Sequence, residues 1–127
     1  MGYDTPDLYY QPEAFDLKVV GSIHDPHANY SFDSFDDLVV WQHQETGELY
    51  WAQDSGCSFP SPFEDYTSLD SANRLTLASW NEFEEAVKSH AQEVVYEPDY
   101  SAISGRIDTP TQAAEKTELL AKVLRLL

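Results

Sequence analysis

Hydrophobic and polar residues alternate in short runs along the first half of the chain, which is the pattern of β-strands. Two such runs, Leu38 to Gln44 and Glu48 to Asp54, are separated by Glu45, Thr46 and Gly47. Because Gly47 can take the positive φ of a tight loop, these runs predict a β-hairpin. A third run rich in β-branched residues, Asp16 to Ile23, predicts a further strand.

The alternation also assigns the two faces of the predicted hairpin. In the first run Val39, Trp41 and His43 share one face, and Leu38, Val40 and Gln42 share the other. In the second run Leu49, Trp51 and Gln53 lie on the face opposite to Tyr50, Ala52 and Asp54. Both faces begin apolar and become polar, so we expect the hairpin to be central at its Leu38 and Ala52 end and exposed near the turn.

The second half of the chain shows helical spacing. One predicted helix spans Ser79 to Val95, with Ser79 and Glu82 as a capping box. Its apolar stripe recurs every three or four residues, at Trp80, Phe83, Val87, Ala91 and Val94. A final helix is predicted to begin at Thr109 and Pro110, a standard cap and first-turn pair, and its last two turns are apolar nearly all round.

Shorter elements complete the prediction. The first 15 residues predict an extended arm that ends in a helical turn at Pro12 to Phe15, with its tyrosines over the core. Between the hairpin and the first helix the pattern is ambiguous. Thr67 or Ser68 can begin one helical turn, and Arg74 to Ala78 can form a short strand.

Together these elements predict an α+β fold with a small antiparallel sheet around a central β-hairpin, packed against one amphipathic helix, plus a C-terminal helix. We divide the chain into a domain at 1–97, a linker at 98–109 that contains Pro98 and Gly105, and the helix at 110–127. That apolar helix needs a surface on which to dock. It packs on its own domain or on a second subunit, in which case it makes a homo-oligomer.

The net charge of the chain narrows the possible binding partners more than any other feature of its composition. The 127 residues include 23 acids and 7 Lys or Arg, for a net charge of -16. Residues 1–73 hold 14 acids and one base (net -13), whereas residues 74–127 hold 9 acids and 6 bases (net -3). Such a surface repels phosphate backbones and anionic membranes, so we expect no direct nucleic acid binding and no membrane binding. A protein with a basic site is the natural partner.

Composition also bounds the class of protein. Aromatic residues make up 13% of the chain, which indicates a folded acidic protein and not a disordered acidic tail. A single cysteine excludes an internal disulfide framework. No apolar run approaches the length of a membrane span and no leader pattern stands at the start, so we expect a cytosolic protein.

Reactive-site patterns are weak throughout the chain. His24 and His27 lie three apart on a loop broken by Pro26 and lack the paired spacing of zinc ligands. Cys57 has no histidine close in sequence, and its acidic neighbours disfavour a thiolate. The carboxylates that bracket the next loop, Asp54, Glu64 and Asp65, lack the spacing of a calcium loop, and no glycine-rich phosphate loop is present. We therefore expect no metal, no cofactor and no catalytic residue, that is, a non-enzymatic protein.

The stretch after the hairpin reads as a stiff, acidic surface loop. Pro60 and Pro62 fix φ angles that a sheet interior does not tolerate. We expect Cys57 to be a small buried hydrophobe there, with the neighbouring aromatic side chains of Phe59, Phe63 and Tyr66 as anchors to the core.

Several blocks resemble a family of small uncharacterised proteins carried by actinobacteriophages, the tailed phages of Mycobacterium, Gordonia and relatives. The blocks are YDTPDLYYQPEAF, YSFD, G-x-L-Y-W-A-x-D-S-G-C, PSPFEDY and EFEEAV, and the resemblance covers Tyr3 to His90. Members often have a second cysteine two places after the first, where this chain has Phe59. That difference counts against a dithiol or a metal clip. The resemblance implies an accessory phage protein in the host bacterial cytoplasm.

The leading functional prediction is therefore binding of a host protein through an acidic surface, as an inhibitor or a DNA mimic. The residues that we expect to form that surface are Asp33, Asp36, Asp37, Asp54, Glu64 and Asp65. The alternative is a small-ligand or nucleotide binder, an anti-defence sponge, with a pocket lined by Trp41, Tyr50 and Trp51.

Overall fold

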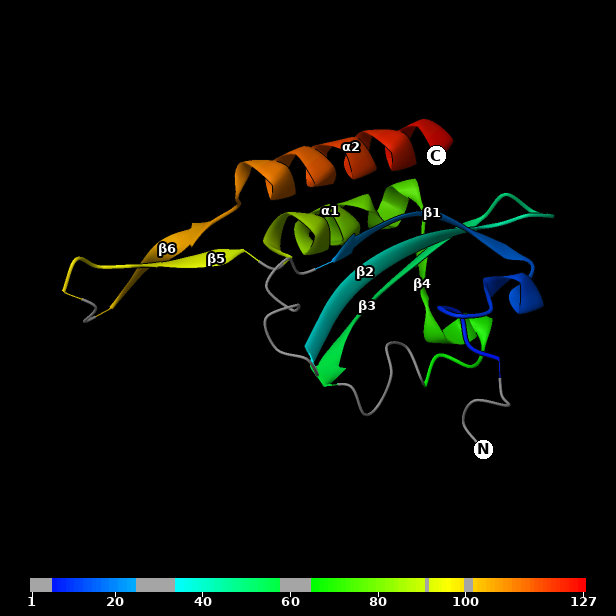
Figure 1. Cartoon of the computed structure of the whole chain (residues 1–127). Helices are drawn as coiled ribbons and strands as arrows, with labels where there is room; N and C mark the ends of the chain where they lie inside the picture. The colour runs from blue at the N-terminus through cyan, green and yellow to red at the C-terminus, as the bar shows by residue number, and fades with distance from the viewer. Residues whose placement is uncertain (1–5, 25–33, 58–64, 91, 100–101) are drawn as a thin grey trace.

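A four-stranded antiparallel sheet with two helices on one face forms the body of the protein (Figure 1). The computed structural model describes residues 6–24, 34–57, 65–90, 92–99 and 102–127. The sheet contains β1 (Leu17–His24), β2 (Ser34–His43), β3 (Leu49–Cys57) and β4 (Asn73–Leu75), in that spatial order. The helices are α1 (Trp80–Ser89) and α2 (Pro110–Leu126). The predicted α+β class is confirmed.

The central hairpin is formed by β2 and β3, as predicted. Val39 pairs with Ala52 and Trp41 pairs with Tyr50, so the register joins the Val39 and Trp41 face of the first strand to the Tyr50 and Ala52 face of the second. Gly47 has a φ of 77° in the turn, where its N–H donates to the carbonyl of His43 at 2.8 Å. Both strands are longer than the alternating pattern indicated.

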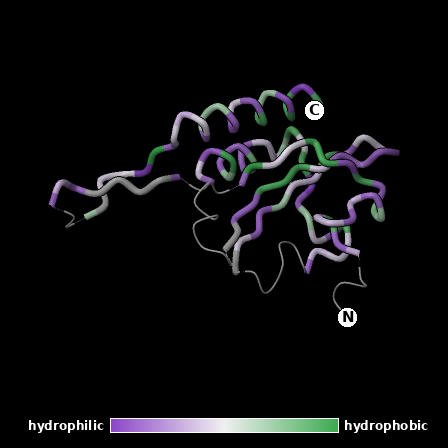
Figure 2. The backbone as a smooth tube through the Cα atoms, in the orientation of Figure 1, coloured by the Kyte–Doolittle hydropathy of each residue, from purple (hydrophilic) through white to green (hydrophobic). Residues whose placement is uncertain are grey.

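Side chains cover both faces of this sheet. The face under the helices carries the helix-side core, which consists of Val20, Ile23, Leu38, Val40, Leu49, Trp51, Leu75, Phe83, Val87, Leu119 and Val123. The opposite face carries the arm-side core, which consists of Leu8, Leu17, Val39, Trp41, Tyr50 and Ala52. Figure 2 shows hydrophobic segments concentrated along the sheet. Burial on both faces explains why both sides of the hairpin are apolar.

The N-terminal arm supplies the cover for the arm-side core. Leu8 is fully buried, and its N–H donates to the carbonyl of Tyr66 at 2.9 Å. The arm ends in the 3-10 helix η2 (Pro12–Phe15), which confirms the predicted helical turn. Tyr9 packs against the arm-side core whereas Tyr10 is exposed, so the prediction that the arm's tyrosines cover the core is right for Tyr9 and wrong for Tyr10.

A β-bulge in β1 reverses which residues face the arm. The pairing with β2 shifts between Val19 and Gly21. Leu17, before the bulge, belongs to the arm-side core, whereas Ile23 after it belongs to the helix-side core. Without the extra residue both odd-numbered positions would share a face. The bulge therefore turns Ser22 and His24 toward the arm side.

The first helix differs from its prediction at both ends. Ser79 makes no capping hydrogen bond, and the capping box lies at Thr76 and Ser79, around the 3-10 helix η5 (Leu77–Ser79). At the other end α1 stops at Ser89, because His90 turns to extended backbone and buries its side chain against the sheet. The predicted extension to Val95 is wrong, since β5 (Glu93–Tyr96) follows instead.

The segment between the helices is a β-hairpin. Residues 98–109, predicted as a linker, include β6 (Ile103–Ile107), which pairs with β5 in a separate two-stranded sheet. In Figure 1 this hairpin extends away from the body. The ambiguous segment before α1 contains both expected elements, the 3-10 helix η4 (Leu69–Ser71) and β4.

The C-terminal helix packs on its own domain in this structure. Thr109 caps α2 by accepting from the N–H of Gln112, as its sequence predicts. Leu119 and Val123 enter the helix-side core, and a Cβ at Gly21 of β1 would lie 2.7 Å from Leu119 Cδ1. The buried Lys116 donates from Nζ to the Asp108 carboxylate at 2.6 Å and to the carbonyl of Lys88 at 2.9 Å. These contacts fasten α2 to β1 and α1.

Candidate functional site

Three of the predicted acidic residues lie at one end of the sheet, where β2 begins and β3 ends. Asp36 and Asp37 belong to β2, and Asp37 pairs directly with Asp54 of β3. Asp65 is exposed. Asp33 and Glu64 lie outside the described residues. The sheet register thus brings together carboxylates that are 17 residues apart in sequence, at positions 37 and 54.

Asp37 is not a surface charge, which corrects the prediction. Asp37 is only 5% exposed, and its Oδ1 lies 2.5 Å from Nδ1 of His24 across the β1–β2 ladder. The phenol of Tyr9 also donates a hydrogen bond to this carboxylate. A carboxylate taken out of water needs such donors. Asp37 therefore organises the site from beneath, and its neighbours form the outer surface.

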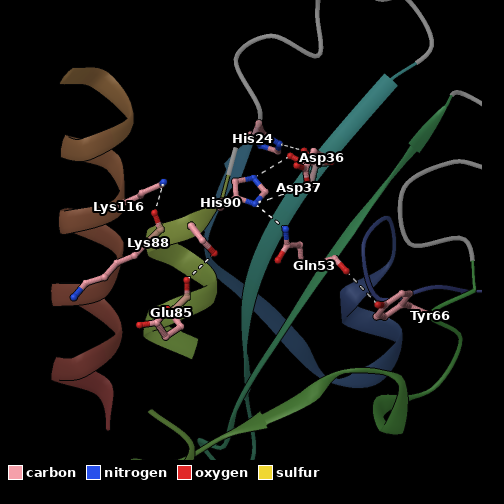
Figure 3. A network of polar contacts seen from close by, with 10 residues as sticks. His24, Asp36, Asp37, Gln53, Tyr66, Glu85, Lys88, His90 and Lys116 are labelled. Carbon is pink, nitrogen blue, oxygen red and sulfur yellow. Dashed lines mark hydrogen bonds and ion pairs between the residues drawn. The ribbon is translucent and has the colours of Figure 1, made fainter. Parts of the chain in front are cut away.

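Asp36 faces the opposite side of β2 and meets His90 (Figure 3). Nε2 of the buried His90 lies 3.1 Å from the Asp36 carbonyl, and Nδ1 lies 3.2 Å from the Gln53 side-chain nitrogen. The carbonyl only accepts, so Nε2 carries the hydrogen and Nδ1 accepts from Gln53. The histidine thus joins the end of α1 to both strands of the hairpin. Asp36 is part of this connection, again in contrast to a free surface acid.

Two exposed tyrosine-bearing segments meet above Asp37 and Asp54. Asp7 Oδ1 accepts from the N–H groups of Tyr9 and Tyr10 at 2.9 and 2.8 Å, which fixes a tight turn of the arm. The two rings pack edge to face with centroids 4.9 Å apart. The hydrogen bond from Leu8 to the Tyr66 carbonyl holds this turn against the segment that contains Asp65. An N-terminal turn and a central loop thereby form one surface.

The directions of the tyrosine pKa shifts indicate the sign of the electrostatic potential at this surface. Burial and then the charge of Asp37 raise the pKa of Tyr9, and burial followed by Asp7 and Asp37 raises the pKa of Tyr10. Burial and the charge of Asp54 raise the pKa of Tyr66. After burial, a carboxylate is the next cause in all three cases, and Tyr10 adds to the shift in Tyr9, which indicates a local negative potential.

We name this surface the acidic tyrosine face and define it by its members, Asp7, Tyr9, Tyr10, Asp37, Asp54, Asp65 and Tyr66. Tyr10 is 56% exposed, so its ring is open to a ligand. Carboxylates attract cations, and the faces of tyrosine rings attract the guanidinium of arginine. The arrangement is suited to a cationic ligand and unsuited to a phosphate.

The predicted aromatic pocket is not assembled. Trp41 and Tyr50 point into the arm-side core, whereas Trp51 points into the helix-side core, where its ring packs against Phe83 with centroids 5.5 Å apart. All three residues are buried. The sheet itself separates them, because Trp51 alternates in direction from its neighbour Tyr50. These aromatic side chains are core residues.

Other predicted features have definite outcomes. Within the described parts of the chain, no group of three or more His, Cys, Asp or Glu is arranged to hold a metal ion. None of the helices described is long and apolar enough to cross a membrane. Cys57 ends β3, but its side chain, together with Phe59 and Phe63, lies outside what the structure describes.

Sequence reasoning missed several members of this site. Tyr9 and Tyr10 join it only through the fold of the arm, for which the sequence carries no periodic signal. His90 was detectable, because it continues the α1 stripe of Trp80, Phe83 and Val87 at a spacing of three. The prediction had placed Ala91 in that stripe instead.

Comparison with known proteins identifies the family but no activity. No curated protein and no solved structure matches the chain. A family model described as Domain of unknown function (DUF7574) matches residues 6–116, which include the whole sheet, α1 and the start of α2. The chain therefore belongs to the DUF7574 family.

Proposed function

We propose that the protein is an accessory protein of an actinobacteriophage that acts in the host cytoplasm by binding a host protein with a basic site. The resemblance of the YWAxDSGC and PSPFEDY blocks to actinobacteriophage proteins supports the phage origin. The binding mode rests on one observation, the convergence of carboxylates and tyrosines on the acidic tyrosine face. Binding there blocks the partner's own use of its basic site.

The distribution of basic side chains supports this choice of surface. Arg74 pairs with Glu48 at 2.9 Å at the far end of the sheet, near the hairpin turn. Lys116 pairs with Asp108, and Lys122 donates to the Val20 carbonyl at 2.6 Å. These cations are used for internal contacts on the helix side and at the turn. The contacts of these three cations lie away from the acidic tyrosine face, where the carboxylates create a negative potential that attracts an external cation.

The partner segment that fits best contains arginine. A planar guanidinium can stack on the exposed ring of Tyr10 while it donates to carboxylates, whereas the compact, strongly hydrated ammonium of lysine stacks less well. Exposed carboxylates steer such a partner over about a Debye length, roughly 10 Å at 0.1 M salt. Association should therefore weaken as salt is added.

Affinity capture from an actinobacterial host lysate tests the proposal. The test variant is Asp54→Asn with Asp65→Asn, and the matched control is Glu115→Gln with Glu118→Gln on the exposed side of α2. Both variants remove two negative charges. We expect the test variant and high salt to abolish capture of a basic partner that the control retains. Capture that is equal in both variants, or insensitive to salt, refutes the proposal.

A further inference from the structure

Ser22, His24 and Asp37 are joined by a continuous series of side-chain contacts on the arm side of the sheet. Ser22 Oγ lies 3.3 Å from Nε2 of His24, and Nδ1 of the same ring lies 2.5 Å from Asp37 Oδ1. Serine meets one ring nitrogen and aspartate meets the other. We propose that these residues form a serine nucleophile with its general base and orienting carboxylate, able to accept an acyl group from a small carboxylic ester.

The β1 bulge and the strand register create this arrangement. Ser22 and His24 are two residues apart on β1, so both project on the same side of the strand. His24 pairs with Asp37 of β2, which places the carboxylate directly across the ladder from the imidazole. The shift in pairing between Val19 and Gly21 selects the side on which the two β1 residues project. Three residues on two neighbouring strands are thus held by backbone pairing.

The hydrogen-bond chemistry gives each group a defined role. The Asp37 carboxylate can only accept, so Nδ1 of His24 carries the hydrogen and Nε2 is left to accept from the Ser22 hydroxyl. The side chain of Asp37 is 8% exposed and that of His24 is 57% exposed. The orienting carboxylate is therefore sheltered, whereas the base is reachable. Tyr9 donates to the same carboxylate and acts as a positioning residue.

The proposed reaction balances without a cofactor. Ser22 Oγ attacks the ester carbonyl carbon while its proton moves to Nε2 of His24. Collapse of the tetrahedral intermediate breaks the bond to the alcohol, which takes that proton as it leaves. A water molecule, deprotonated by the same nitrogen, then attacks the acyl carbon. The bond to Ser22 Oγ breaks, the carboxylic acid is released, and the proton on Nε2 returns to Ser22 Oγ.

A fluorophosphonate probe tests the nucleophile directly. The serine oxygen forms a bond to phosphorus, fluoride leaves, and His24 takes the serine proton. The intact protein is incubated with the probe, and peptide mass spectrometry measures the labelling rate at each serine. Ser55, exposed on β3, is the internal reference within the same molecule. We expect Ser22 to be labelled at least about a hundredfold faster than Ser55, the lower end of the usual contribution of a general base.

Variants separate the proposed chemistry from simple exposure. We expect His24→Gln to reduce the rate at Ser22 to that at Ser55, Ser22→Ala to abolish labelling at this position, and Ser55→Ala to leave it unchanged. Ser22→Ala removes only an exposed hydroxyl and should keep the wild-type melting temperature. His24→Gln also removes a partner of the buried Asp37, so its labelling rate is measured well below its own melting temperature and compared with Ser55 in the same molecule. Asp37→Asn should also slow the labelling of Ser22, because the amide no longer favours the His24 tautomer that carries its hydrogen on Nδ1. Labelling of Ser22 no faster than Ser55, or unaltered by His24→Gln, overturns the proposal.

Discussion

Gly21 of β1 lies against Leu119 of α2, so the effect of Gly21→Ala on stability should depend on whether the Leu119 side chain is present. A Cβ at Gly21 would lie 2.7 Å from Leu119 Cδ1, whereas carbon atoms pack best at about 3.5–4.0 Å. Overpacking of this kind costs about 1–3 kcal/mol. Alanine in a strand otherwise gains about 0.5–1 kcal/mol over glycine. We therefore expect Gly21→Ala to destabilise the protein by about 1 kcal/mol.

Removal of the opposing side chain should reverse that sign. Leu119→Ala alone should cost about 2–5 kcal/mol, because Leu119 is 5% exposed in the helix-side core. In the Leu119→Ala background the new methyl group meets no Cδ1. Gly21→Ala should then be neutral or stabilising by about 0.5 kcal/mol. The coupling energy of the double-mutant cycle should therefore exceed about 1 kcal/mol.

Urea unfolding followed by tryptophan fluorescence measures all four proteins, since Trp51 lies in the same core. Gly105→Ala is the matched control, because a Cβ there would meet no heavy atom within 4 Å. That control should be neutral or slightly stabilising. If Gly21→Ala costs the same with and without Leu119, the two sites do not touch, and the packing of α2 on β1 described above is refuted.

Three further measurements probe other contacts. His90→Ala should destabilise the protein by about 2–4 kcal/mol in urea unfolding, because it empties a buried site and leaves the Asp36 carbonyl and the Gln53 amide without their partner. A loss below about 1 kcal/mol would contradict the connection that His90 makes between α1 and the hairpin. Lys116→Ala should cost about 2–3 kcal/mol, since Asp108 loses a buried partner, and a neutral result argues against that ion pair. The pKa of Tyr66 is raised above 10.0 in the folded state, so its contribution to stability is present below about pH 10 and is lost as the pH rises through the raised value. Phenolate absorbance that rises at the same pH in folded and urea-unfolded protein would contradict this.

The sheet was predictable from local pattern because its information is local. Alternation identified the two faces of each hairpin strand, and Gly47 marked the turn, whereas the register of the structure shows which faces combine. The end of α1 was not predictable from the sequence, because Ala91 and Val94 continue the helical spacing by coincidence. The competing influence is tertiary, since the burial of His90 against β2 and β3 ends the helix.

The candidate site was only half predictable for a related reason. Its carboxylates Asp37 and Asp54 were predicted as acidic surface residues, and the register of the hairpin pairs them directly. Tyr9 and Tyr10 depend on the arm, which is held by the burial of Leu8 and by its backbone hydrogen bond to Tyr66, contacts over a long sequence separation. Likewise, a bulge that reverses the direction of Ser22 and His24 leaves no mark in a pattern that alternates regularly.

The central claim is that the acidic tyrosine face is where a basic partner binds, and a nuclear magnetic resonance titration tests it most directly. A short oligoarginine peptide is added to isotope-labelled protein while every backbone amide is followed. We predict that the largest shifts fall on Tyr9, Tyr10, Asp54, Asp65 and Tyr66, and that Asp54→Asn with Asp65→Asn removes them. Equal shifts at the exposed acids of α2, or shifts that persist in that variant, would contradict the claim.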